Sequence, residues 1–469
     1  MPGLPLDAPR AVALRRAADH IEQAWASFDR ARDGQPPLDD ALGRVLAGGL
    51  PEDATPVLKA LDDAAQVLDE SHAPARPRYF AFVGSSGLEV AVLADALAAA
   101  YDVNLATHAG AADLVDRQAL DWVGRFVGYP ATGGAFTSGG MISNLTALVV
   151  ARESALPGVR ETGLHARPAA LYCSAEAHYS VQRAAEVLGI GASGVRSIPI
   201  DGRRRMVAAA AAAAIDADVA AGITPVAVVA TAGTTLTGAV DPIGELAGVC
   251  AERGVWLHVD GAYGLPAAAA PATRGLFEGL ARADSVSVDA HKWLYLPKAC
   301  GVVLVRDRAA LERAFVHDEA YMLHGDDGLN AVDRTLEYSR PFRALKLWLA
   351  FRVHGAAAFR EAIGDNIALA RRLAEMIRAH PELELVVDEP QLSTVPFRHV
   401  PPGVTDLDAH NLALVDALQR DSRVYVSSAS IDGHACLRPC IVNFRTTEAD
   451  VQALVDVAVE LGRSLAPAS

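Results

Sequence analysis

An aspartate and a lysine, 32 residues apart, are the side chains of this sequence best suited to chemistry. Asp260 ends an apolar segment in His-Val-Asp-Gly-Ala-Tyr (258–263), and Lys292 follows another in Ser-Val-Ser-Val-Asp-Ala-His-Lys-Trp (285–293). A lysine amine can form a Schiff base with an aldehyde, and a carboxylate can pair with a protonated ring nitrogen. A single lysine is ordinarily a solvated surface amine, but here it follows a strand-like run and precedes Trp293. The pair therefore predicts an enzyme that uses pyridoxal 5'-phosphate (PLP).

Three further segments place small, hydroxyl or imidazole groups after apolar runs. The segment 135–144, Ala-Phe-Thr-Ser-Gly-Gly-Met-Ile-Ser-Asn, precedes a helical stretch, so its backbone N–H groups and the helix dipole favour a phosphate. The segment 230–238 offers Thr235 to a ligand at the carboxyl end of a strand. His178, in 174–180, can stack on a pyridine ring and meet a substrate carboxylate. The alternatives for the three are an ordinary turn, a threonine-rich turn and a structural histidine.

Apolar runs with β-branched residues alternate with helical stretches through the middle of the chain. The expected strands are Ala170–Ser174, Val226–Thr231, Val255–Asp260, Ser285–Asp289 and Gly301–Val305. The expected helices include Leu145–Ser154, Ser180–Leu188, Val207–Ala221 and Ile243–Arg253. This alternation predicts an α/β domain whose sheet is mostly parallel, which gathers the strand ends named above at one edge.

The two ends of the chain differ from this middle region. Helical spacing at 11–32 and 55–71 predicts peripheral helices before a joint at 74–77. The later segments predict helices at 343–356, 366–379, 408–421 and 448–465, with strands at 383–387, 423–427 and 437–443. We therefore expect an N-terminal helical segment at 1–78, a large domain at 79–345 and a small C-terminal α+β domain at 346–469.

Composition narrows the class of protein. A formal net charge of −15 disfavours nucleic acid or an anionic membrane surface as a partner. Hydrophobic residues make up 51% of the chain, enough for a sizeable core, yet no apolar run reaches the length of a membrane span. The start of the chain lacks the pattern of a signal peptide, so we expect a cytoplasmic protein. Five scattered cysteines without a Cys-x-x-Cys pair predict no metal site.

Together these motifs resemble the group II PLP-dependent decarboxylases, which include the aromatic L-amino acid, histidine and glutamate decarboxylases. The resemblance spans about 77–447 and also includes Arg-Pro-Phe-Arg-Ala-Leu-Lys-Leu-Trp (340–348) and Cys-Ile-Val-Asn-Phe-Arg-Thr-Thr (440–447). It implies the aspartate-aminotransferase-like fold (fold type I), with a mixed, mostly parallel seven-stranded sheet. It also implies a homodimer with the site at the subunit interface and the N-terminal helices packed on the partner.

The resemblance also implies a role for each matching residue. Lys292 would form the Schiff base, Asp260 would pair with the ring nitrogen, and Ala262 and His178 would pack on the two ring faces. Tyr321 would donate a proton from a loop rich in Gly and Asp. Thr235 would contact the cofactor, and the phosphate would be surrounded by Ser85, Gly139, Gly140, Met141, Asp289 and His291. The substrate pocket would be lined by Phe80, Phe82, Leu105, His108, Tyr338 and Ser339.

Some positions depart from the family pattern. Met141 and Ile142 stand where the family has a hydroxyl and then a small residue, so backbone N–H groups are expected to replace the lost hydroxyl. Asp113 and Asp116 stand in a segment that is usually Thr-Glu-Leu-Glu, and Ala290 replaces a proline. None of these changes removes a catalytic group, but they leave the substrate open.

The expected reaction is decarboxylation of an L-amino acid to its amine and CO2. The mostly apolar pocket set favours an aromatic or other hydrophobic substrate over glutamate, although Arg340 or Arg445 could serve a carboxylate. An oxidative aldehyde synthase or another lyase would share every cofactor residue, and Tyr321 favours plain decarboxylation. A non-catalytic binding protein on the same fold is disfavoured by the intact Lys292, Asp260 and His178.

Overall fold

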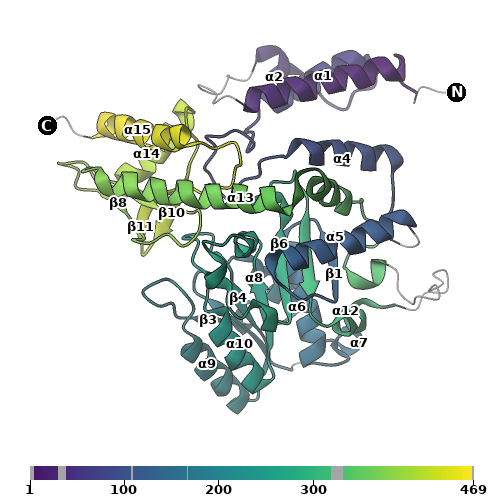
Figure 1. Ribbon diagram of the computed structural model, residues 1–469, viewed down its shortest axis with the longest axis vertical. Helices are drawn as coiled ribbons and strands as arrows, with labels where there is room; N and C mark the ends of the chain where they lie inside the picture. Colours follow the sequence, from purple (N-terminus) through teal and green to yellow (C-terminus); the bar gives the residue numbers. More distant parts are fainter. Residues whose placement is uncertain (1–4, 30–38, 107–108, 166, 318–330, 467–469) are drawn as a thin grey trace.

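The computed structural model describes residues 5–29, 39–106, 109–165, 167–317 and 331–466. Its main sheet has seven strands in the order β1-β7-β6-β5-β4-β2-β3 (Figure 1). The five neighbouring strands β6, β5, β4, β2 and β3 are parallel, and β7 runs antiparallel to both β6 and β1. The strands are β1 (Gly133–Thr137), β2 (Ala169–Ser174), β3 (Val195–Ile198), β4 (Thr224–Thr231), β5 (Trp256–Asp260), β6 (Ser285–Asp289) and β7 (Gly301–Val305). The predicted mixed, mostly parallel seven-stranded sheet is confirmed.

Helices cover both faces of this sheet. Helix α6 (Gly140–Ala155) crosses β4 to β7 and packs beside α8 (Ser180–Val187) and α12 (Arg308–Phe315). Helices α9 (Ala208–Ala220) and α10 (Ile243–Arg253) pack against β4 and β5. Successive side chains of a strand point to opposite faces. Val228 and Ala230 of β4 accordingly join one core and Val229 joins the other, which buries the strand on both sides.

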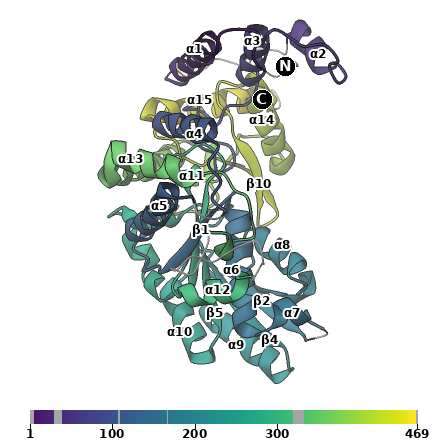
Figure 2. The same ribbon diagram turned by 90° about the vertical axis from the view of Figure 1, so that its right-hand side faces the viewer.

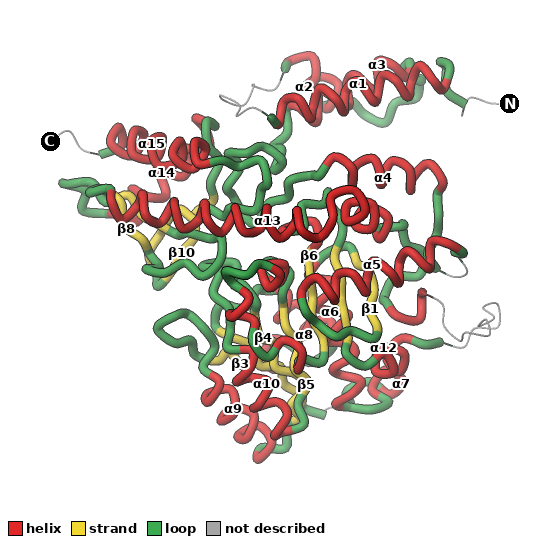
Figure 3. Tube along the Cα trace, viewed as in Figure 1, coloured by secondary structure: helices red, strands yellow, loops and turns green. Residues whose placement is uncertain are grey.

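A second, smaller antiparallel sheet has the order β10-β11-β9-β8. Its strands are β8 (Leu383–Leu385), β9 (Phe397–His399), β10 (Ser427–Ile431) and β11 (His434–Arg438), covered by α14 (Leu407–Asp421) and α15 (Glu448–Leu465) (Figure 3). The strands predicted at 423–427 and 437–443 have the wrong bounds: β10 begins four residues later than predicted and β11 begins three residues earlier. Asp432 and Gly433 both have positive φ and form the two-residue turn of a hairpin, a local signal that the sequence carries.

Helix α13 (Ala344–Ala379) links the two sheets. It packs on α4 (Glu89–Tyr101) and α5 (Ala111–Val127) at its start and on α15 and β8 near its end. Its backbone leaves helical geometry only at Gly355, where φ is +73°. Gly355 therefore divides this element into two helices, as predicted, but the second begins at the break and not at 366. Residue 79 pairs with Tyr425, so the chain just after the N-terminal helices also contacts the small sheet.

The N-terminal helices form a layer of their own at one end of the molecule (Figure 2). They are α1 (Arg10–Phe28), α2 (Asp40–Leu46) and α3 (Val57–Asp69), and α3 contacts the other two. Helix α3 has no buried residue, α1 buries only Ala13 and α2 only Leu42. Large apolar side chains of this layer, including Leu14 and Leu68, are exposed.

Candidate active site

The sheet brings the predicted catalytic residues to one edge. The parallel strands β2, β4, β5 and β6 end side by side, because their register aligns Thr231 with Asp260 and Asp260 with Ser287. Ligands of α/β sheets bind at such carboxyl ends. The side chains that follow these strand ends are His178, Thr235, Asp260, Asp289 and Lys292. The charges of Asp260, Asp289 and Lys292 act on the pKa of the His178 imidazole, which indicates that these groups lie near one another.

Lys292 lies in the short helix α11 (Ala290–Trp293), directly after β6. Its Nζ atom is 3.4 Å from Oδ2 of Asp289, and its side chain keeps 23% of its surface exposed. The next residue, Trp293, is fully buried, stacks on Tyr263 and donates a hydrogen bond from Nε1 to Asn366. The rigid tryptophan fixes the backbone, so the lysine amine is held at the site and remains reachable.

Asp260 is buried and held by three donors. Its Oδ2 accepts a hydrogen bond of 2.8 Å from Nδ2 of Asn144. Its Oδ1 accepts bonds from the backbone N–H of Ala262 at 3.1 Å and from the Ser287 hydroxyl at 3.2 Å. Donors face both oxygens, so the carboxylate is fixed in place. A carboxylate held in this way suits pairing with a cationic ring nitrogen.

A directed chain of hydrogen bonds leads to this carboxylate. Trp256 Nε1 can only donate, and it donates to the Ser285 hydroxyl at 2.8 Å, while Ser285 lies 2.9 Å from Nδ1 of His258. His258 Nε2 lies 3.0 Å from Oδ1 of Asn144, whose amide group donates to Asp260. Since an ionised carboxylate can only accept, the Asn144 amide group donates to Asp260. Oδ1 of Asn144 then accepts from His258 Nε2, which therefore carries a proton.

The buried His258 of this hydrogen-bond chain leads to a prediction about how the free energy of unfolding depends on pH. Burial lowers the pKa of His258 to about 4, against about 6.5 for an unfolded histidine. Between these values only the unfolded chain takes up the proton, so the free energy of unfolding falls as pH drops from 6.5 towards 4. One such proton contributes up to about 1.4 kcal/mol per pH unit. Urea unfolding of the protein between pH 4 and 7 should show this slope, and His258→Gln should reduce it by that amount.

The matched control for this prediction is the exposed His354. His354→Gln should leave the pH slope of the unfolding free energy unchanged. Equal slopes in the wild type and in His258→Gln would contradict the assignment of a neutral, buried imidazole.

His178 lies in the loop between β2 and α8. Burial lowers the pKa of its imidazole below the usual 6.5, although the Asp260 charge opposes this. Its Nδ1 accepts a hydrogen bond of 3.2 Å from the backbone N–H of Ser180, so the neutral ring carries its proton on Nε2. A neutral, oriented ring suits stacking on a flat ligand and leaves one N–H free to donate.

The predicted phosphate cradle assembles at the start of α6. A Cβ atom built on Gly140 would lie 2.7 Å from Cβ of Ala262 and 2.9 Å from Oδ2 of Asp289, so only glycine fits there. At Gly139 the nearest atoms belong to His291 and Asp289. The first N–H groups of a helix have no intrahelical acceptor, and α6 directs them to this point. The space left by glycine, the start of α6, the Lys292 amine and the oriented Asp260 carboxylate fit PLP.

The other predicted cofactor residues surround this region in different ways. Ser85 is buried, but its hydroxyl donates to the Leu296 carbonyl at 2.7 Å, four residues after Lys292. Met141 is half-buried in the first turn of α6. Thr235 is also half-buried, and its carbonyl accepts a bond of 2.8 Å from Arg438 of β11. The small sheet therefore directly contacts the loop after β4 that carries Thr235, which we call the cofactor loop.

The predicted substrate residues separate into two groups. Phe80 and Leu105, predicted to form part of a mostly apolar pocket wall, are each 1% exposed and pack in hydrophobic cores. Phe82 is 60% exposed and adjoins the small sheet, because Ser427 accepts a bond from its backbone N–H. Ser339 lies elsewhere, since its hydroxyl accepts a bond of 3.3 Å from the Asn104 amide group. The predicted residues His108 and Tyr321 lie outside the described residues.

Sequence reasoning missed three contributors. Asn144 stood within the glycine-rich segment, and His258 within the Asp260 motif, but nothing in a linear motif shows that their amide and imidazole meet. Arg438 was also missed. It lies in the apolar segment predicted as a strand at 437–443, where an arginine is an unusual residue, and the structure shows that it is buried.

Two features are absent from the part of the chain that the structure describes. No group of three or more His, Cys, Asp or Glu side chains is arranged to hold a metal ion. None of the described helices combines the length and the apolar character needed to cross a membrane. The five cysteines are buried free thiols.

Comparison with known proteins identifies the family. Residues 42–400 match the pyridoxal-dependent decarboxylase conserved domain. The chain is 36% identical over 383 residues to an aromatic-L-amino-acid decarboxylase of Bacillus atrophaeus, covering 79% of this chain and 78% of the relative. It is 33% identical over 369 residues to the human cysteine sulfinic acid decarboxylase, covering 75% of each.

A solved structure agrees with the sequence relatives. The crystal structure of Oryza sativa TDC with PLP and tryptamine superimposes with a TM-score of 0.91 over 100% of both chains, at 26% identity. The relatives carry the names of decarboxylases for different amino acids, so the family is shown and the substrate is not. The chain belongs to the pyridoxal-dependent decarboxylase family: it is a PLP-dependent amino acid decarboxylase.

Proposed function

We propose that this enzyme decarboxylates an L-amino acid with an aromatic or other hydrophobic side chain, giving the amine and CO2. The observation that carries the substrate class is the position of Phe82. Its backbone N–H donates to the Ser427 hydroxyl, Ser427 accepts from Arg438, and Arg438 donates to the Thr235 carbonyl. These contacts connect the backbone of Phe82, whose side chain is largely exposed, to the loop that carries Thr235. The similarity to an aromatic-L-amino-acid decarboxylase supports the same class.

In this proposal each residue of the site has its own chemical role. Bound PLP supplies an electron-poor ring that accepts the electron pair of the bond to the leaving carboxylate. Lys292 provides the amine that attaches the cofactor and takes and returns protons at the substrate nitrogen. Asp260 provides a fixed, buried negative charge opposite the ring nitrogen, where a charge pair is worth more than in water. His178 covers one face and donates from Nε2, and Tyr321 returns a proton to the substrate Cα.

The phosphate is held at the start of α6 in this proposal. Gly140 and Met141 present backbone N–H groups, and Gly139 keeps the cradle open because it has no side chain beside His291 and Asp289. Asp289 and His291 close the cradle from the end of β6. Ser85 supports the segment after Lys292, Ala262 packs against the cradle, and Thr235 faces the cofactor from the end of β4. The substrate contacts are proposed to come from Phe82, Tyr338 and Ser339, together with His108.

Removing the Phe82 ring tests the substrate class. Phe82→Ala should raise KM for an aromatic substrate roughly tenfold, because an aromatic contact and its buried area are lost. Phe82→Leu, which keeps most of the apolar volume, should change KM by less. Steady-state kinetics on phenylalanine-, tyrosine- and tryptophan-like substrates measures both. An unchanged KM in Phe82→Ala would remove Phe82 from the substrate pocket.

An aldehyde synthase is the second candidate function, because it would use the same cofactor residues. It is separated from a decarboxylase by the proton that Tyr321 returns to Cα. General acid assistance typically contributes ~100- to 10,000-fold. Tyr321→Phe should therefore form amine at least about 100-fold more slowly. With dissolved O2 as the oxidant and water as co-reactant, it should instead release aldehyde, ammonia and hydrogen peroxide, measured with parallel amine and peroxide assays. Amine formation at the wild-type rate would show that Tyr321 is not the donor.

We also propose a homodimer built on the N-terminal helical layer. Leu14 and Leu68 of that layer and Leu97 and Tyr101 of α4 are largely exposed, and a second copy would bury them. In this proposal, residues 1–78 pack on the partner, 79–345 form the cofactor domain, and 346–469 form the small domain. Light scattering should give twice the chain mass, and a monomer at micromolar concentration would contradict the proposal.

The function itself is tested by a screen of the common amino acids for CO2 release by the PLP-loaded enzyme, with amine, aldehyde and peroxide measured in parallel. We expect the highest kcat/KM for an aromatic amino acid and amine as the product. Preference for cysteine sulfinate, glutamate or a diamino acid would overturn the substrate class and leave the family assignment intact.

A further inference from the structure

Arg204 joins three segments that meet beside the candidate active site. It lies in the loop between β3 and α9, and its side chain is largely buried. Its guanidinium donates to Glu176, which is two residues before His178. It also donates to both carboxylate oxygens of Asp432, at 2.8 and 3.2 Å, in the turn between β10 and β11. One side chain thus connects the His178 loop to the small sheet.

Glu176 extends this connection to the cofactor loop. Its side chain is 4% exposed, so its charge lies almost entirely out of water. One carboxylate oxygen accepts from Arg204, and the other accepts from the hydroxyls of Thr237 at 3.2 Å and Thr234 at 3.4 Å. Thr234 and Thr237 flank Thr235 in the loop after β4. A single buried carboxylate therefore holds the loops that carry His178 and Thr235.

The backbone at Arg204 shows that its side chain compensates for a conformational cost. Its φ is +63°, a left-handed conformation that few residues other than glycine adopt. A glycine at position 204 would adopt this backbone freely, without a guanidinium. Strained positions of this kind persist when the surrounding contacts fix them. Here those contacts are the ion pairs with Glu176 and Asp432.

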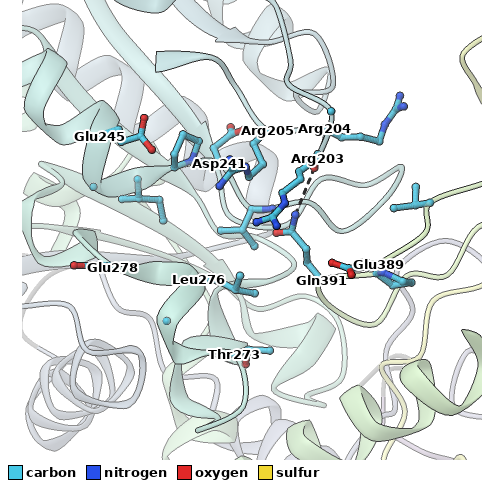
Figure 4. A pocket seen from close by; sticks show the side chains of 18 of the residues that line it. Arg203, Arg204, Arg205, Asp241, Glu245, Thr273, Leu276, Glu278, Glu389 and Gln391 are labelled. Atoms are coloured by element: carbon cyan, nitrogen blue, oxygen red, sulfur yellow. Dashed lines mark hydrogen bonds between the residues drawn. The ribbon is translucent and has the colours of Figure 1, made fainter. Parts of the chain in front are cut away.

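The pair lies at the border between the two sheets, next to an open cleft of about 1280 Å³. The cleft is lined by residues of both parts of the chain, among them Arg203, Arg205, Asp241 and Glu389. It contains none of Lys292, Asp260 or His178, so it is not the candidate active site. Figure 4 shows the Arg204 side chain pointing away from Asp241 and Glu245, in contrast to its neighbours in the loop. Arg204 also lines this cleft, but its guanidinium is engaged by Glu176 and Asp432.

We propose that Arg204 and Glu176 are positioning residues that set the placement of His178 and Thr235 in the cofactor site. Neither is proposed to touch the reacting atoms. Glu176 fixes the two loops relative to each other, and Arg204 compensates its buried charge and ties both loops to the small sheet. The inference rests on the proposed roles of His178 and Thr235. Without Arg204, an uncompensated buried carboxylate remains between the loops, which is costly.

The test compares the variants Arg204→Met, Glu176→Gln and the double variant in the full chain. Hydrogen exchange of apoenzyme peptides covering 174–180 and 231–238 should be faster in Arg204→Met than in the wild type. The dissociation constant for PLP, measured by absorbance titration, should rise about tenfold, within the usual range for coupled contacts. Adding Glu176→Gln to Arg204→Met should bring both the exchange rate and the dissociation constant for PLP back towards the wild-type values, because the neutral amide needs no counter-charge.

Arg205→Met is the matched control. Arg205 belongs to the same loop but pairs with Asp201, at 2.7 Å, away from the site. It should leave the exchange of both peptides and the PLP affinity at wild-type values. Wild-type exchange and affinity in Arg204→Met, equal losses in Arg204→Met and Arg205→Met, or no rescue by Glu176→Gln would each overturn the proposal. The exchange measurement needs no cofactor, so failure of the wild-type protein to bind PLP would count against the proposed function alone.

Discussion

Lys292→Ala should abolish turnover while leaving the fold intact. In the proposed mechanism the amine at this position attaches the cofactor and exchanges protons with the substrate, and no other described lysine amine lies beside Asp289. We expect a loss of at least about 10,000-fold in kcat, since both nucleophilic attachment and general acid–base assistance disappear. CO2 release by the PLP-saturated variant measures the loss, and circular dichroism checks the fold.

Lys298→Ala is the control for this prediction. Lys298 is an exposed lysine six residues further along the chain, close enough for its charge to act on His291. Its removal should change kcat by no more than a few-fold. An Lys292→Ala protein with more than about 1% of wild-type turnover, or an inactive Lys298→Ala protein, would show that the wrong amine has been assigned.

Asp260→Asn should lower the rate of decarboxylation by about 100- to 1,000-fold, the usual cost of removing one preorganised electrostatic contact. The asparagine keeps the shape of the side chain and can still accept from Ala262 and Ser287, but it loses the negative charge that the ring nitrogen requires. Single-turnover measurements with saturating substrate report the chemical step, and absorbance of the bound cofactor reports occupancy.

Comparison with Ser287→Ala distinguishes the contribution of the Asp260 charge from that of its orientation. It removes one hydrogen bond of 3.2 Å to Asp260 and leaves the carboxylate charged. A bond to a charged group is worth about 1.5–3 kcal/mol, so the rate should fall by roughly tenfold to a hundredfold, less than in Asp260→Asn. Equal losses in the two variants would mean that position, and not charge, is the contribution of Asp260.

Long periodic segments and strand-end motifs were predictable from the sequence. Strands β6 and β7 and helices α10 and α15 were predicted with the observed bounds, because apolar periodicity and glycine or capping signals mark both ends. Strands β1 and β3 were missed. Strand β1 is glycine-rich and pairs with the distant β7, so its conformation depends on long-range contact. The small-domain hairpin was misplaced because the Asp-Gly turn at 432–433 was overlooked.

Some residues of the candidate site were likewise predictable from the sequence, and others were not. Lys292, Asp260 and His178 follow strand ends, and a parallel sheet aligns strand ends whatever lies between them. The chain from Trp256 through His258 and Asn144 depends on side-chain directions across three segments, which no linear spacing reveals. Phe80 and Leu105 were assigned to the pocket by resemblance, yet local packing buries both.

The attachment of the cofactor to Lys292 is the central claim, and one measurement tests it most directly. The enzyme is saturated with PLP, reduced with borohydride, digested and analysed by mass spectrometry. The structure predicts that the peptide containing Lys292 carries the reduced cofactor and that the peptide containing Lys298 without Lys292 does not. Recovery of the Lys292 peptide unmodified under these conditions, or attachment to a different lysine, would contradict the assignment.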